Sequence, residues 1–194
     1  MIPSIISYIS SSVWLFIPLK QKDTVYFYYF LILAISCVLL LVNRLLLIHP
    51  AHFYLTLDFF LIVSLFDFKK IPNYAFFLIM ILVVSISLSF LLSIKIITLC
   101  LLIQHAVIFF IILKRTIIYS YQKEKLNLFQ FVLLLYEITV VTRFLVILHN
   151  IKTNLIYFYL TAAFGILIGI FFLFYNVESS PKFNMARKDI IDTD

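Results

Sequence analysis

Charged residues and glycine are scarce in this chain of 194 residues. Only 12% of the residues are charged and only two are glycine, whereas 64% are hydrophobic. An ordinary soluble domain is about 25% charged and about 45–50% apolar, and a small globule leaves much of its surface in water. The composition therefore excludes a soluble enzyme, a disordered tail and a disulfide-rich secreted module, and it predicts an integral membrane protein.

The sequence also lacks the short motifs that mark metal, nucleotide and hydrolase sites. Its two cysteines, Cys37 and Cys100, lie in apolar runs and form no Cys-x-x-Cys pair. The sequence contains no Gly-x-Ser-x-Gly elbow, no His-Glu-x-x-His and no phosphate-binding glycine loop. We therefore predict no metal and no cofactor, and the absence of catalytic motifs favours a role other than that of an enzyme.

Seven apolar stretches are each long enough to cross a bilayer as a helix, which takes about 17–25 residues. They predict an all-α, polytopic membrane helix bundle that forms one domain over residues 1–175. The polar segment 176–194 is then a short cytoplasmic tail, which we expect to be disordered. The stretches are Ile2–Leu19, Thr24–Asn43, Ala51–Phe68, Pro72–Ser93, Ile96–Leu113, Leu126–Leu148 and Leu155–Tyr175.

The basic residues are divided unevenly between the two sets of loops that seven transmembrane helices create. One side, which includes the tail, holds eleven of the 15 Lys and Arg residues. Because basic loops stay in the cytoplasm, we expect the N-terminus outside and the C-terminus in the cytoplasm of a cell inner (plasma) membrane. An organellar membrane is the alternative. The first stretch is rich in serine, and six spans remain if it lies in the interface.

The loop expected between the fifth and sixth stretches is strongly basic. It carries Lys114, Arg115, Lys123 and Lys125, with two tyrosines between them. Anionic headgroups attract such a segment, and tyrosine prefers the headgroup layer. We predict an inner basic face that contacts membrane lipid, with a cytosolic protein partner as the alternative. Direct binding of nucleic acid is not expected.

Small residues recur four apart on two of the predicted helices. Gly165 and Gly169 do so in the last stretch, and Ser85 and Ser89 do so in the fourth. Small residues at this spacing line one helix face and allow a neighbouring backbone to approach closely. We predict that these rows pack helices within one bundle, and the alternative is a homo-oligomer seam.

Polar side chains at membrane depth are costly, so each needs a partner or a function. Depth along the predicted helices places His105 and Glu137 near the midplane, and it places Asp58, Arg44 and Arg143 in the outer half. We expect the residues at the midplane to pair with each other, and those in the outer half to do the same. The sets either fix the register of the helices or form a proton-titrating or ligand-recognising site. The candidate residues are Asp58, Gln104, His105, Gln130, Glu137 and Arg143.

Three functions are consistent with these features. The first is a small multipass membrane protein that acts through protein or lipid interaction, as a sensor, regulator or accessory subunit. The second is an oligomeric channel or pore-forming effector. The third is an intramembrane hydrolase that acts on lipid through Glu137, His105 or Asp58. The sequence shows no internal repeat and no helix broken at its middle, which argues against alternating-access transport.

Overall fold

A computed structural model describes residues 2–46, 51–66, 75–149, 151 and 155–184, and within these ranges the chain is helical apart from turns and two short strands. The all-α prediction is therefore confirmed. Each helix begins and ends within about ten residues of one predicted stretch. The helices are α1 (Ile2–Lys20), α2 (Phe27–Leu46), α3 (Ala51–Ser64), α4 (Ala75–Leu91), α5 (Ile94–Lys123), α6 (Leu128–Leu148) and α7 (Leu155–Phe174), and the strands are β1 (Lys125–Asn127) and β2 (Lys182–Asn184).

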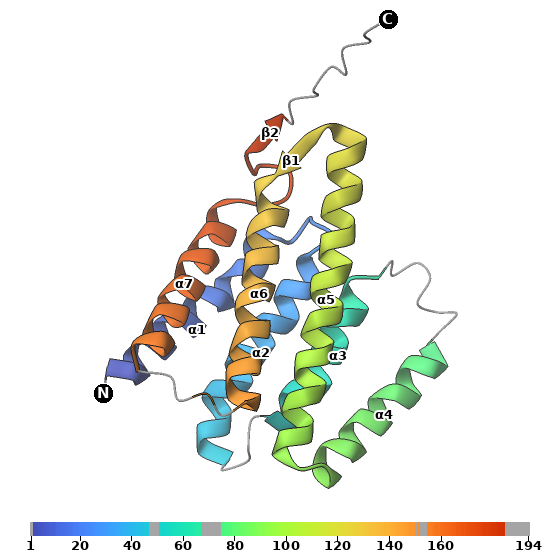
Figure 1. Cartoon of the computed structure of the whole chain (residues 1–194), viewed down its shortest axis with the longest axis vertical. Coiled ribbons are helices and arrows are strands. Elements are labelled where there is room, and N and C mark those ends of the chain that lie inside the picture. The colour runs from blue at the N-terminus through green and yellow to red at the C-terminus, as the bar shows by residue number, and fades with distance from the viewer. Residues whose placement is uncertain (1, 47–50, 67–74, 150, 152–154, 185–194) are drawn as a thin grey trace, which may run out of the picture.

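Six of the helices form a ring, in which α2 and α6 run opposite to their neighbours, whereas α3 and α5, and likewise α1 and α7, lie side by side in the same direction (Figure 1). Helices α1, α2, α3, α5 and α6 pack against one another in that order, and α7 packs along α1. The ring is completed by a shorter contact between α6 and α7. Helix α4 packs against α3 on the outside. Side chains from all six helices therefore face the centre of the ring.

An aromatic cluster holds the ring together at the end where α6 begins and α7 ends. The Phe172 ring lies 4.9 Å from the ring of Phe30 and 4.9 Å from that of Phe129, measured between centroids. All three side chains are fully buried. Each such ring removes a large apolar area from its surroundings, and tilted ring pairs of this kind add about 0.5–1.5 kcal/mol. The cluster fixes α2, α6 and α7 at this end of the bundle.

Helix α5 is longer than the sequence predicted. The expected loop over residues 114–125 is helical as far as Lys123, and the helix ends where Glu124 adopts a left-handed conformation with φ 52°. The buried face of the helix continues past the apolar run through Thr116 and Ser120, so packing supports helix beyond the predicted boundary. The ten extra residues extend α5 by about 15 Å at 1.5 Å per residue.

The first part of the tail is ordered, in contrast to the disorder that we expected for residues 176–194. Strand β2 pairs with β1 in an antiparallel register. The Ser180 hydroxyl accepts a hydrogen bond from the Phe129 amide at 2.9 Å, and the Asn127 side chain donates to the Val177 carbonyl at 2.8 Å. These contacts hold the tail against the start of α6, while residues 185–194 lie outside the described ranges.

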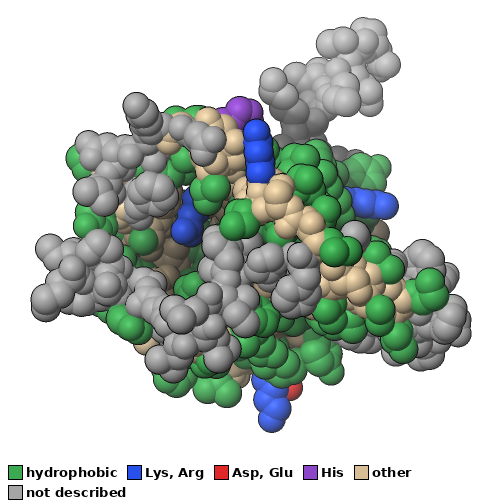
Figure 2. Space-filling model, turned by 90° about the horizontal axis from the view of Figure 1, so that it is seen from below, with side chains coloured by type: hydrophobic (Ala, Val, Ile, Leu, Met, Phe, Trp, Pro, Cys, Tyr) green, Lys and Arg blue, Asp and Glu red, His purple; other side chains and the backbone are tan. Residues whose placement is uncertain are grey.

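Two helices, α5 and α6, are long and apolar enough to cross a membrane. Within their most apolar stretches only 33% and 17% of the residues are buried by the rest of the protein. Three shorter apolar helical segments cover Phe27–Leu40, Phe53–Ser64 and Tyr159–Phe174. Figure 2 shows one end of the bundle, where hydrophobic side chains cover much of the visible surface and charged side chains are few.

Candidate functional site

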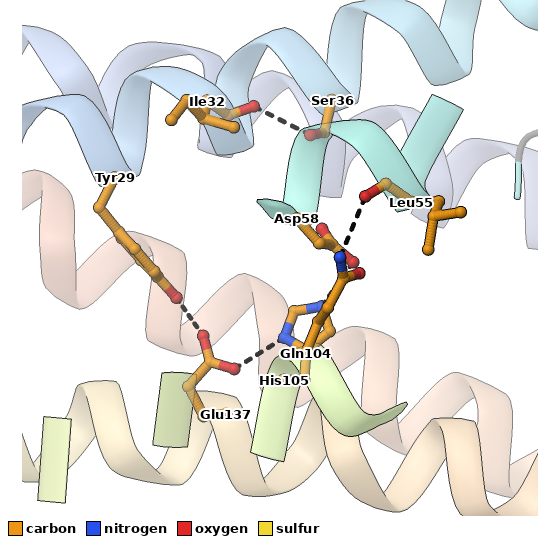
Figure 3. A network of polar contacts seen from close by, with 8 residues as sticks. All are labelled: Tyr29, Ile32, Ser36, Leu55, Asp58, Gln104, His105 and Glu137. Atoms are coloured by element: carbon orange, nitrogen blue, oxygen red, sulfur yellow. Dashed lines mark hydrogen bonds and ion pairs between the residues drawn. The ribbon is translucent and has the colours of Figure 1, made fainter. Parts of the chain in front are cut away.

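One imidazole joins two carboxylates inside the ring of helices (Figure 3). The Nδ1 atom of His105 lies 2.8 Å from Oε2 of Glu137, and its Nε2 atom lies 3.2 Å from Oδ2 of Asp58. Relative exposure is 4% for His105, 4% for Asp58 and 0% for Glu137. Both ring nitrogens therefore contact a buried carboxylate, one on α6 and one on α3.

The network continues to a fourth helix through Tyr29 on α2. The Tyr29 hydroxyl donates a hydrogen bond to Oε1 of Glu137, so both oxygens of this carboxylate are held (Figure 3). Tyr29 is fully buried as well. Hydrogen bonds to a charged group are stronger than those between neutral groups, and the low dielectric of an interior strengthens them further. The network thus fixes the Glu137 carboxylate more firmly than that of Asp58.

Helical periodicity explains why these side chains face inward. His105 continues a buried row on α5 that includes Leu101, Ile108 and Ile112, which are spaced three or four residues apart. Residues at this spacing lie on one face of a helix. Glu137 likewise shares the buried face of α6 with Gln130, which lies seven residues earlier.

The structure confirms the predicted pairing of His105 with Glu137 but not the predicted partners of Asp58. We expected Asp58 to pair with Arg44 or Arg143 in the outer half of the membrane, and it pairs with His105 instead. Depth along separate helices did not predict that one imidazole contacts both Asp58 and Glu137. Arg143 is exposed, and the Arg44 side chain lies outside the described part of the structure.

Of the two predicted glutamines, only Gln104 has a described contact beside the network. The Gln104 side chain donates a hydrogen bond to the Leu55 carbonyl at 3.2 Å, which ties α5 to α3 near Asp58 (Figure 3). Gln130 is buried near the start of α6. Neither glutamine lines the cavity that lies next to the network.

A cavity of ≈ 640 Å³ lies beside the network and is lined by side chains from six helices. Asp58 and His105 form part of its wall, whereas Glu137 and Tyr29 lie behind them in the network. The wall also contains Trp14, the only tryptophan in the sequence. Buried charged groups next to a largely apolar cavity are typical of a binding site.

Helices α6 and α7 both contribute to the wall of the cavity. The two helices meet at the Phe129–Phe172 contact, and toward their other ends they supply separate parts of the cavity wall. Gly165 belongs to this wall, and a Cβ atom added to it would meet nothing within 4 Å. This glycine therefore leaves open space and is not a packing contact, contrary to our expectation.

Gly169 is a true packing residue, and its partner helix is in the same chain. A Cβ atom at this position would lie 2.7 Å from Cγ1 of Val13 and 3.3 Å from Nε1 of Trp14, both on α1. The surface of α7 at Gly169 is thus covered by α1 of the same chain. This argues against a homo-oligomer interface at this position. Ser85 lies on α4, and the Ser89 side chain is outside the described part of the structure.

Sequence reasoning missed two residues of the site, Tyr29 and Trp14. Tyr29 is one of five consecutive aromatic residues at the start of α2, where Tyr28 is 48% exposed and Tyr29 is fully buried. Tyr28 and Tyr29 differ only in the direction in which they point from the helix axis. The sequence does not predict that direction, because the surrounding run is apolar on every side of the helix. Trp14 carried a weak signal, since it is the single tryptophan of the chain.

The geometry limits the chemistry of the site. A nucleophile–histidine pair needs one imidazole nitrogen on the nucleophile and the other on an orienting group. In this site both nitrogens of His105 contact carboxylates. Among the residues that the structure describes, no group of three or more His, Cys, Asp and Glu is arranged to hold a metal ion. The imidazole of His105 is therefore oriented by one carboxylate on each side.

Comparison with known proteins gives no further guide to the role of this site. No protein-family model matches the chain, and no similar curated protein or solved structure was found. The function is accordingly inferred from the burial, charge and cavity of the site itself.

Proposed function

We propose that the chain is a multipass membrane protein that binds a small ligand in its central cavity and acts as a sensor or regulator. The observation that carries this proposal is a buried acid–imidazole–acid network in the wall of a ≈ 640 Å³ cavity. Burying charged groups inside an apolar membrane bundle costs free energy. Such groups are therefore interpreted as part of a functional site. The cavity lies within one chain, which supports ligand binding over a pore formed by self-association.

The outward-facing apolar surface supports the membrane part of the proposal. A core helix of a soluble protein buries most of its apolar residues, whereas only 33% and 17% of the residues in the most apolar stretches of α5 and α6 are buried, and the others are partly or fully exposed. An exposed apolar surface of this extent would cause a soluble monomer to aggregate. In a bilayer the same surface faces hydrocarbon. The seven helices then cross the membrane in alternating directions, with the N-terminus outside.

The ends of α5 provide a direct test of this topology. Single cysteines at Lys95 and Lys123, introduced in a background with Cys37→Ala and Cys100→Ala, are probed with a membrane-impermeant thiol reagent in bacterial spheroplasts. We expect Lys95→Cys to react in intact spheroplasts and Lys123→Cys to react only after permeabilisation, because the positively charged end stays inside. Equal labelling of both positions before permeabilisation would contradict the proposal.

Trp14 tests whether small molecules reach the cavity. Although Trp14 is only 5% exposed, it lines the cavity, so the small neutral quencher acrylamide is expected to reduce its fluorescence in the purified, detergent-solubilised protein. Gly165→Leu places a side chain in the open space and should lower the quenching constant without unfolding the protein. If both proteins have the same quenching constant, Trp14 does not report on an accessible cavity and the binding proposal fails.

A further inference from the structure

We infer that the ligand is an organic cation, an ammonium group carried by an apolar or aromatic body, and that the Asp58 carboxylate pairs with the ammonium. This inference rests on the proposed function, because it assumes that the cavity binds a ligand. It goes beyond that function by assigning a chemical class to the ligand and a recognition role to one residue.

The charge of the network is the first argument. The network contains two carboxyl groups, those of Asp58 and Glu137, and one imidazole, so its acidic groups outnumber its basic ones. An uncompensated charge in an apolar interior is expensive. A cation that enters the cavity would balance this charge, whereas an anion would add to it.

The position of Asp58 is the second argument. Glu137 is held by both His105 and Tyr29 and does not line the cavity, whereas Asp58 does. The carboxylate that a ligand meets is therefore that of Asp58. A buried carboxylate that faces a cavity can accept charge-assisted hydrogen bonds from an ammonium group, and these are about twice as strong as neutral ones.

The aromatic wall is the third argument. Trp14, Tyr54, Tyr136 and Tyr159 all line the cavity, and the Trp14 and Tyr136 rings lie 4.6 Å apart between centroids. The face of an aromatic ring attracts a cation, and tryptophan does so most strongly. The same rings pack favourably against an apolar ligand body. A cationic head with such a body therefore matches both features of the wall.

Arg143 is the one Lys or Arg residue in the wall of the cavity as the structure describes it. It is exposed, whereas Asp58 is 4% exposed and contacts His105. A charge in water is screened far more strongly than a buried one. The buried charged group that a ligand meets beside His105 is therefore the Asp58 carboxylate.

Three probes with nearly the same body and different charge test the inference. The full-length protein in detergent is titrated with 2-phenylethylamine, 2-phenylethanol and 3-phenylpropionate, with the fluorescence of Trp14 as the readout. We expect the amine to bind roughly tenfold more tightly than the alcohol, with the carboxylate weakest. Asp58→Asn should reduce the affinity for the amine to that for the alcohol, whereas Glu178→Gln, which removes an exposed carboxylate outside the cavity wall, should preserve the preference for the amine.

The outcomes separate the ligand class from the existence of the binding site. If the alcohol or the carboxylate binds as tightly as the amine, the inference is wrong while the cavity still binds small molecules. If none of the three probes changes the fluorescence of Trp14 although acrylamide quenches it, the cavity is accessible and the inference is also wrong. If Asp58→Asn is too unstable to purify, the relative affinities of the three probes for the unaltered protein still test the predicted class of ligand.

Discussion

His105→Leu is expected to lower the free energy of unfolding by about 3–5 kcal/mol, the cost of removing one partner from a buried ion pair. The substitution fills a similar volume but leaves the Asp58 and Glu137 carboxylates, which are almost fully buried, without the imidazole between them. The loss can be measured by following helical circular dichroism during SDS titration in mixed micelles. The same substitution at the exposed His149 should leave stability within about 0.5 kcal/mol of the unaltered protein.

A triple variant separates the loss of charge balance from the loss of packing. Adding Asp58→Asn and Glu137→Gln to His105→Leu removes both buried charges, so most of the lost stability should return. If the single variant is as stable as the unaltered protein, the network does not hold the helices together. If the triple variant is no more stable than the single one, the imidazole acts through its packing and not through its charge.

Gly169→Leu is expected to destabilise the bundle by about 1–3 kcal/mol, the usual cost of inserting atoms into a packed contact. Even the first added carbon would lie 2.7 Å from Cγ1 of Val13, so the Val13 side chain or α7 itself must shift. Gly165→Leu is the matched control on the same helix. Its first added carbon meets nothing within 4 Å, and leucine favours helix over glycine by up to about 1 kcal/mol.

The two leucine variants also distinguish packing within the chain from self-association. We expect both to keep the same particle mass in detergent, because the Gly169 face is already covered by α1. Thermal unfolding in detergent gives the relative stability. Equal destabilisation by both substitutions, together with a lower particle mass, would restore the interpretation of the glycine row as an oligomer seam.

The sequence predicted the helices well because apolar length is a property of local composition. It was less successful where contacts distant in the sequence decide the structure. The end of α5 depends on the burial of Thr116 and Ser120, and neither residue type signals burial by itself. Strand β1 forms against β2, more than 50 residues later, and three-residue strands that each contain a lysine have no pattern that predicts strand.

The candidate site was predicted in part for a similar reason. The cost of burying charge singled out Asp58, His105 and Glu137, and all three meet in the structure. Their order in the network depends on how the helices pack against one another, which is a tertiary property. Tyr29 and the cavity depend on the rotation of α2 and on the packing of α6 and α7, and neither can be obtained from one sequence.

The bridging position of His105 also has a mechanical consequence. Since one imidazole is held from two sides, α3 and α6 cannot separate or slide past α5 without breaking a contact to a charged group. Helix α6 leads directly from β1, and β1 pairs with the ordered start of the tail. The same helix, α6, thus carries Glu137 of the buried network and follows directly on the strand that holds the start of the tail.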